Sequence, residues 1–197
     1  SFTSDHRDYV AYQLHGYYFH GSISRSGLTE NDDLKKTDAA VTFAKFFSLG
    51  KNFYLSNNLI GYLSTPNDLP YYNYGALGYR TQFIRGYEVY VIEGHSYAAA
   101  KTTLKKRIFS RRYHWAAMPI EQFRHIPISI YLKTYADLGY VNNYENYPAG
   151  ALLTGKLLSG FGGGVDIVGS YDVVLRFEYS FNGEGENGFF FHVKKEF

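Results

Sequence analysis

The feature that most limits how this chain can fold is an alternation of side-chain character that returns in segment after segment. It is clearest at residues 128–140. One face of that segment holds Ile128, Ile130, Leu132, Ala136 and Leu138, and the other holds Ser129, Tyr131, Lys133, Tyr135 and Asp137. Successive side chains of a strand point to opposite faces, so a period of two predicts β-strands, and the 3.6-residue period of a helix is hard to find. The sequence therefore predicts an all-β, antiparallel fold.

The alternation divides the chain into eight predicted strands. The segments between them hold clusters of Asn, Asp and Gly. All five prolines fall in these connections or at the edge of a strand, because proline cannot donate a hydrogen bond in a central ladder. Each predicted strand has roughly ten residues, which is enough for a tilted strand to cross a bilayer. The predicted strands are residues 9–21, 39–49, 52–64, 97–109, 128–140, 157–169, 171–181 and 189–197.

The aromatic content favours strands that have lipid on one side and water on the other. The 197 residues include 21 Tyr, 16 Phe and one Trp, while the hydrophobic fraction is an ordinary 45%. In membrane β-barrels such residues form girdles at the two interfaces, the apolar face contacts lipid and the polar face lines the lumen. A soluble β-sandwich also uses Tyr and Phe, and there the apolar face would be the core. Periodicity alone does not separate these two folds.

Several functional classes lack the residues that they need. The absence of Cys excludes disulfides, thiol chemistry and Cys-ligated zinc. No apolar run approaches the length of a membrane-spanning helix, and a net charge of +2 is too small to indicate a nucleic-acid partner. We predict no catalytic residue, cofactor or metal site, and therefore no enzyme. Residues 1–8 are mostly polar and do not form a signal peptide, so an exported protein would be represented by its mature chain or a fragment.

A glycine-rich run, Gly160-Phe161-Gly162-Gly163-Gly164, invites comparison with a phosphate-binding loop. It lacks the final glycine of that motif, and no helix pattern follows it. On a strand, Gly160, Gly162 and Gly164 share one face with Asp166. This pattern predicts a smooth inner surface that another stretch of backbone approaches closely.

A long connection, about residues 65–95, separates the third and fourth predicted strands. It is far longer than the usual handful of residues, and such loops are normally functional or disordered. It contains Ile84-Arg85-Gly86-Tyr87, which matches the [VI]-R-G-[FY] motif of a long extracellular loop. Tyr135-Ala136-Asp137-Leu138-Gly139 is similar to the F-x-D-x-G motif two strands later, and Phe189, Phe191, Val193 and Phe197 form one face of a closing strand. Together these features resemble the BamA/TamA superfamily of outer-membrane assembly and translocation barrels, the bacterial surface antigen family.

The resemblance covers essentially the whole chain, and it implies a fold and a place in the cell. Five strands follow the long loop, as in the family's sixteen-stranded barrel. We therefore expect an antiparallel transmembrane β-barrel of the bacterial outer membrane, with eight strands here forming its C-terminal half. Residues 1–197 would be one part of that barrel domain, and the loop at 65–95 would enter the lumen. The first strand, 9–21, would pair with a strand outside these residues.

The resemblance also implies a function. We expect a factor that inserts other outer-membrane proteins through a lateral gate and strand exchange, without bond chemistry. Its partners would be the outer-membrane bilayer, client proteins or a secreted passenger, and accessory lipoproteins, but no nucleic acid. Alternatives are a secretion pore of the two-partner type, a passive channel, and a self-contained eight-stranded barrel, whose side chains would leave little room for the loop.

Within this resemblance the predicted site is a contact between the loop and the polar face of a strand. Arg85 is expected to fold into the lumen and bond Asp137, with Gly86 allowing a tight turn, Tyr87 packing its ring and Gly139 completing the second motif. The family often has a Glu on the strand after the loop, where this chain has Lys101, Lys105, Lys106 and Arg107. Asp137 is therefore the predicted partner of Arg85, and the nearby cations are predicted to face the lumen or the membrane edge.

Overall fold

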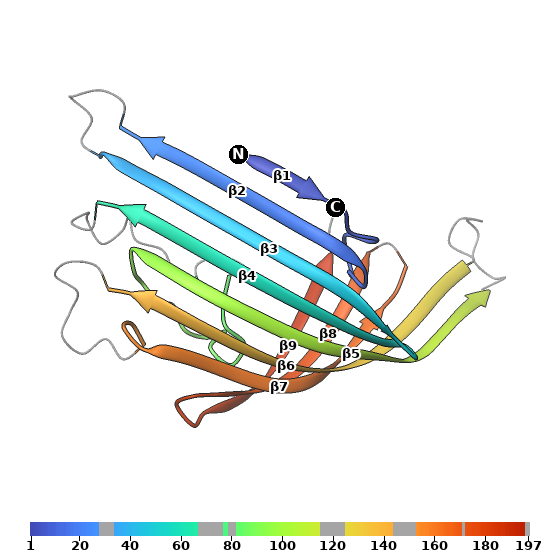
Figure 1. The fold of residues 1–197 in the computed structure, drawn as a ribbon. Helices are drawn as coiled ribbons and strands as arrows, with labels where there is room; N and C mark the ends of the chain where they lie inside the picture. Colours follow the sequence, from blue (N-terminus) through green and yellow to red (C-terminus); the bar gives the residue numbers. More distant parts are fainter. Residues whose placement is uncertain are drawn as a thin grey trace.

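The computed structural model describes residues 1–27, 34–66, 77–78, 82–114, 125–143, 153–170 and 172–195. These residues form one nine-stranded antiparallel sheet in which the strands follow one another in chain order (Figure 1). The all-β, antiparallel prediction is confirmed. The strands are β1 (Phe2–Asp5), β2 (Gly16–Ser26), β3 (Lys36–Gly50), β4 (Phe53–Thr65), β5 (Ser96–His114), β6 (His125–Asn142), β7 (Leu157–Val168), β8 (Val173–Asn182) and β9 (Asn187–Lys195).

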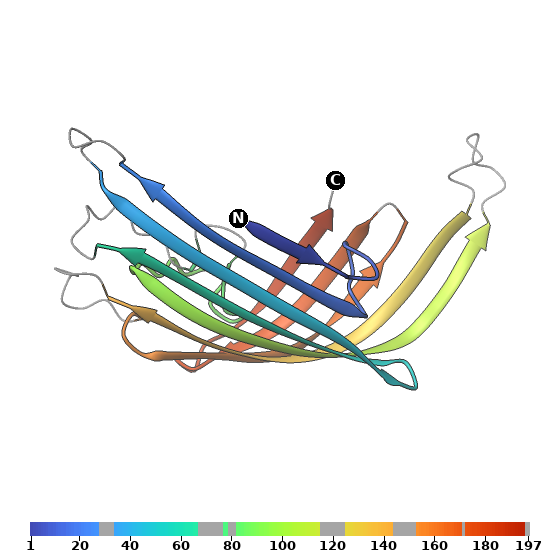
Figure 2. The same cartoon turned by 45° about the horizontal axis from the view of Figure 1, so that its top comes forward.

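The sheet curves into an open trough (Figure 2). β1 and β9 are its two edges, and the described residues contain no pairing between them, so the sheet is not closed into a barrel. The described residues between β4 and β5 lie on the concave side of the trough and pack against β4 to β7 there. The sheet therefore has a concave face covered by its own loops and a convex face left open.

The polarity of the two faces of the sheet is the reverse of that in a soluble protein, where the apolar face is buried. On β6, Lys133 and Asp137 of the concave face are 2% and 1% exposed, whereas Leu132 and Leu138 of the convex face are each 49% exposed. The register carries this parity across neighbouring strands, because Asp137 pairs with Lys101 and Gly160 while Leu138 pairs with Ala100 and Ser159. Polar and charged groups thus fill the interior, and large apolar side chains form the outer surface.

The number of strands differs from the eight predicted, and the first predicted strand was wrong in its bounds. Phe2–Asp5 is a short ninth strand that pairs with β2, so the partner of β2 lies within these residues. Residues 9–15 are not a strand: Tyr12 is buried and its hydroxyl bonds Asp166 on the concave face. The chain turns into β2 at Gly16, whose φ of 100° is in the left-handed region that favours glycine.

The β5–β6 hairpin is longer than predicted. Its ladder continues past the bulge between Arg107 and Phe109 as far as the pair His114 and His125. β4 ends its pairing with β5 at Lys106, so the outer part of the hairpin extends beyond the neighbouring strand (Figure 2). The alternation is weak over 110–114, where Ser, Arg and His replace apolar residues, and for this reason the sequence indicated a connection there.

The connections alternate between two rims because every neighbouring pair of strands is antiparallel. Those that follow β4 and β6 begin at one rim, and the β3–β4 and β7–β8 turns lie at the other (Figure 1). This is the arrangement predicted for the 65–95 and 141–156 segments and for the 50–51 and 169–170 turns. Phe197, predicted for the second rim, lies outside the described residues.

Candidate functional site on the concave face

The long loop is fixed to the concave face by an apolar cluster. The backbones of Leu77 and Ile92 bond each other in both directions, at 3.0 and 2.9 Å, and close the loop on itself. Four buried apolar side chains from the described part of the loop then meet one residue from each of four strands. The cluster consists of Leu77, Ile84, Tyr87 and Ile92 from the loop and Ile60, Ala99, Val141 and Leu158 from β4, β5, β6 and β7. The packing places the predicted loop motif directly over the polar part of the sheet.

Arg85 and Asp137 form the centre of the site, as the sequence predicted. The Arg85 Nε donates to Asp137 Oδ2 at 2.8 Å, Nη2 donates to Oδ1, and the backbone N–H of Arg85 also donates to Oδ2 at 3.2 Å. The carboxylate therefore receives three donors from one residue. Both residues are buried, so the pair has the planar, two-bond geometry in which a guanidinium binds a carboxylate best.

Two other strands, β5 and β8, and a second residue of β6 complete the surroundings of Arg85. Its Nη1 donates to Thr103 Oγ1 of β5 at 3.0 Å, and its guanidinium carbon lies 3.9 Å from the centre of the Tyr135 ring. Glu178 of β8 places Oε1 3.9 Å from Nη1. A second carboxylate thus faces the arginine. It comes from β8, whereas the sequence analysis considered a second carboxylate only on the strand that follows the loop. Because Glu178 belongs to no motif, its position on the polar face of 171–181 was the only available signal.

A second charge network adjoins this centre. Lys133 lies between two carboxylates, 2.6 Å from Asp166 Oδ1 and 2.8 Å from Glu178 Oε1. Arg176 Nε donates to the same Asp166 oxygen at 3.2 Å. The Tyr12 hydroxyl, from the segment between β1 and β2, donates to Asp166 Oδ2 at 3.0 Å. Segments from opposite rims of the sheet therefore meet on one continuous set of charges.

Glycines make room for the loop, as the glycine-rich run predicted. A Cβ added at Gly160 would lie 1.7 Å from the Arg85 carbonyl oxygen, and one at Gly139 would lie 2.8 Å from the Ile84 side chain. Gly86 itself has a φ of 92° in the left-handed region. The Asn182 amide donates to its carbonyl at 3.1 Å, and Gly183 N–H donates to the Tyr87 hydroxyl at 3.1 Å. Loop and sheet backbones thus touch without intervening side chains.

Glu88 holds the turn of the loop motif. Its Oε2 accepts the Gly86 N–H at 2.6 Å, while Oε1 is buried and has no hydrogen-bond partner in the described part of the chain. Burial raises the pKa of this carboxyl above its ordinary value.

The predicted residues of the closing strand lie on the convex face, apart from this site. Phe189, Phe191 and Val193 of β9 are all exposed and share one side of the strand. Phe197, the fourth residue of that set, lies outside the described residues. The structure therefore brings together the loop motif, Asp137 and Gly139, and it leaves the closing strand at the edge of the sheet.

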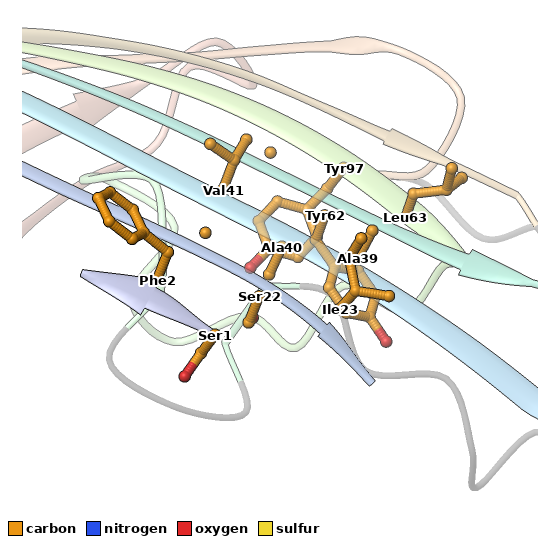
Figure 3. Close-up of a pocket in the computed structure, with 12 residues that line it drawn as sticks. Ser1, Phe2, Ser22, Ile23, Ala39, Ala40, Val41, Tyr62, Leu63 and Tyr97 are labelled. Carbon is orange, nitrogen blue, oxygen red and sulfur yellow. The ribbon is translucent and has the colours of Figure 1, made fainter. Parts of the chain in front are cut away.

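An apolar hollow of about 670 Å³ is lined by residues of β1 to β5 (Figure 3). It forms where small residues are neighbours in the sheet, since Gly21 and Gly61 both pair with Val41. Phe2, Ile23 and Leu63 also line it. These residues offer no charged group that could orient a polar substrate, so the concave face remains the better candidate site.

Searches of family models, of curated proteins and of solved structures found no match to this chain. Across the described ranges, no group of His, Cys, Asp and Glu has the arrangement of a metal site. No helix in the part of the chain that the structure describes could span a membrane. The geometry itself is that of a pinned loop on a charged surface, and the functional role of its residues stays a prediction.

The first prediction concerns Arg85. Replacing it with Ala leaves Asp137 buried without its two side-chain donors, and we expect a local loss of about 3–5 kcal/mol. The loop should become sensitive to protease while the strands persist, because the ladders do not involve Arg85. Arg85→Lys keeps the charge but not the two-bond geometry, so it should recover only part of the protection. Equal protease resistance of the wild type and Arg85→Ala would contradict this role.

The second prediction uses the glycines of β7. Gly160→Ala should displace the loop, because the new Cβ would overlap the Arg85 carbonyl, and we expect it to cost about 1–3 kcal/mol. Gly163→Ala is the matched control on the opposite face, where the nearest atom is a backbone oxygen at 3.4 Å. Denaturant titration and protease sensitivity of the loop would measure both. A Gly160→Ala variant as stable as the control would mean that the loop does not rest on β7.

Proposed function

We propose that this chain is the C-terminal half of a BamA-type barrel of the bacterial outer membrane, which inserts or translocates other proteins. In this proposal the convex face contacts lipid and the concave face lines the lumen. The nine strands would be completed by strands that precede them, so the trough would be one wall of a larger barrel. The loop at 65–95 would lie inside that lumen and hold its wall in shape through Arg85.

The inverted sheet is the observation that carries the proposal. Water does not favour a surface on which Leu132, Leu138 and many other large apolar side chains stand open, whereas lipid does. The concave face has the opposite character, with Lys133, Asp137 and Glu178 each 2% exposed or less. A soluble sandwich would bury the apolar face instead. The Arg85 contact adds support, because it joins two of the three features on which the resemblance rests.

The proposed mechanism uses backbone pairing and membrane deformation. β9 pairs only with β8, so the hydrogen-bonding groups of its other edge have no strand partner among the described residues. Such an edge is a template on which another strand can be added. In the proposal, this edge forms a weak seam with the first strand of the complete barrel, and a client strand pairs there. No catalytic group or cofactor is needed for such an exchange.

Depletion of the full-length protein tests the assembly role. Within the first generations, outer-membrane β-barrel proteins should fall in abundance and accumulate unfolded in the periplasm, while inner-membrane proteins stay constant. An Arg85→Ala copy should complement less well than the wild type. Unchanged levels of all outer-membrane proteins would refute the assembly role. Steady single-channel conductance of the purified protein, without such an effect, would favour a passive channel.

The lipid contact of the convex face gives a separate prediction. Leu59 lies in the middle of β4 and Leu63 near its end, and both are about half exposed on the convex face. Leu59→Arg should reduce the free energy of folding into bilayers by about 2–4 kcal/mol, and the control Leu63→Arg by about 0–1 kcal/mol. Urea titration in vesicles measures both. Equal, small effects would place this face in water.

A further inference from the structure

A polar cavity of about 530 Å³ lies between the long loop and the concave face of the sheet. Its lining is rich in cations: Arg85, Lys101, Lys105, Lys133 and Arg176. The carboxylates that line it are Asp166 and Glu178. Asp137 and Glu88 lie close by, so the nearest described groups comprise five cations and four carboxylates. An interior of this kind is costly unless each charge has a partner.

The carboxylates are used by three of the five cations. Arg85 bonds Asp137, Lys133 contacts both Asp166 and Glu178, and Arg176 shares Asp166 with Lys133. Lys101 and Lys105 are the two remaining cations of the lining. Neither forms an ion pair within 4.0 Å with a carboxylate in the part of the chain that the structure describes. The ammonium groups of Lys101 and Lys105, on the same face of β5, thus line one cavity with no carboxylate within 4.0 Å of either among the described residues.

Among the described residues, the surroundings of Lys101 and Lys105 leave some of the N–H donors of their ammonium groups without a hydrogen-bond partner. Lys105 is 7% exposed, its ammonium lies 4.1 Å from the centre of the Tyr12 ring, and its hydrogen bond to the Gln13 carbonyl is long, at 3.4 Å. The Lys101 ammonium lies 4.7 Å from the centre of the Phe83 ring. An aromatic face stabilises a cation on one side only. The remaining N–H groups can therefore bind a ligand that enters the cavity.

We propose that this cavity binds a small oxyanion of the phosphate or sulfate class, held by Lys105 and Lys101. Lysine binds such anions as a point charge, and the ligand would supply the charge that the described carboxylates do not. Asn58 and Ser56 of β4 add neutral hydrogen-bonding side chains to the lining. A lipid headgroup fits less well, because its acyl chains would have to share a cavity lined by charged groups. The proposal concerns the chemistry of the concave face and goes beyond the assembly role.

Titration calorimetry with inorganic phosphate tests the site. The full-length protein that contains this chain is folded in detergent and titrated at constant ionic strength, with chloride as the reference anion. We expect a saturable isotherm for the wild type that sulfate competes away. Lys105→Met should weaken phosphate binding by at least about tenfold, because a buried charge contact is lost. Lys101→Met should also weaken it.

Lys106→Met is the matched control, since Lys106 is the next residue on β5 but lies on the convex face, exposed and over the Phe53 ring. It should bind phosphate like the wild type. Absence of a saturable isotherm in the wild type would overturn the proposal, as would equal affinities in Lys105→Met and Lys106→Met. The wild-type isotherm and the sulfate competition decide the question even if Lys105→Met does not fold. Loss of the assembly role in cells with an intact isotherm would refute only the proposed function.

Discussion

A buried carboxylate has to be paired, and the pairing of Asp137 determines the arrangement of the concave face. Its two oxygens receive the side-chain and backbone donors of Arg85, which lies 52 positions away in the chain. Bringing that guanidinium to β6 requires the loop to cross the sheet. The loop can cross only where the sheet has no side chain, and this is why Gly160 and Gly139 lie beneath Arg85 and Ile84. One ion pair thus determines the path of the loop and the residues below it.

The inverted sheet explains why so much polar structure is needed. A soluble fold fills its interior with apolar side chains, whereas here the apolar side chains stand on the outside and the interior is filled by loops and charges. The apolar cluster around Leu77, Tyr87 and Leu158 occupies one end of the concave face, and the Tyr12 segment occupies the other. In the proposed membrane setting, these two segments perform the packing that a hydrophobic core performs elsewhere.

Which residues of a strand point to the polar face and which to the apolar face could be predicted from the sequence, because alternation is a local property. At residues 128–140 every side chain assigned to the polar face, from Tyr131 to Asp137, is buried as that face requires. The same rule failed for two segments. Phe2–Asp5 is too short to show a period. Residues 9–15 carry Tyr9 and Tyr12 on what would be opposite faces of a strand, and Tyr12 instead anchors a loop. The Arg85 contact could be predicted because both partners belong to motifs, but Glu178 could not, since its proximity depends on the curvature of the sheet.

Charge balance connects the loop to the rest of the interior. Arg85 pairs with Asp137 and approaches Glu178. Glu178 and Asp166 both pair with Lys133, and Asp166 also pairs with Arg176. If the loop left the surface, Asp137 would lose its partner and the positive charge of Arg85 would leave the interior with it. The interior would then gain a free carboxylate near Lys101, with which Asp137 is paired in register. Movement of the loop would therefore redistribute ion pairs on β5 and β6. In the proposed anion site, the position of the loop and the anion affinity of the cavity would then be coupled through the same charges.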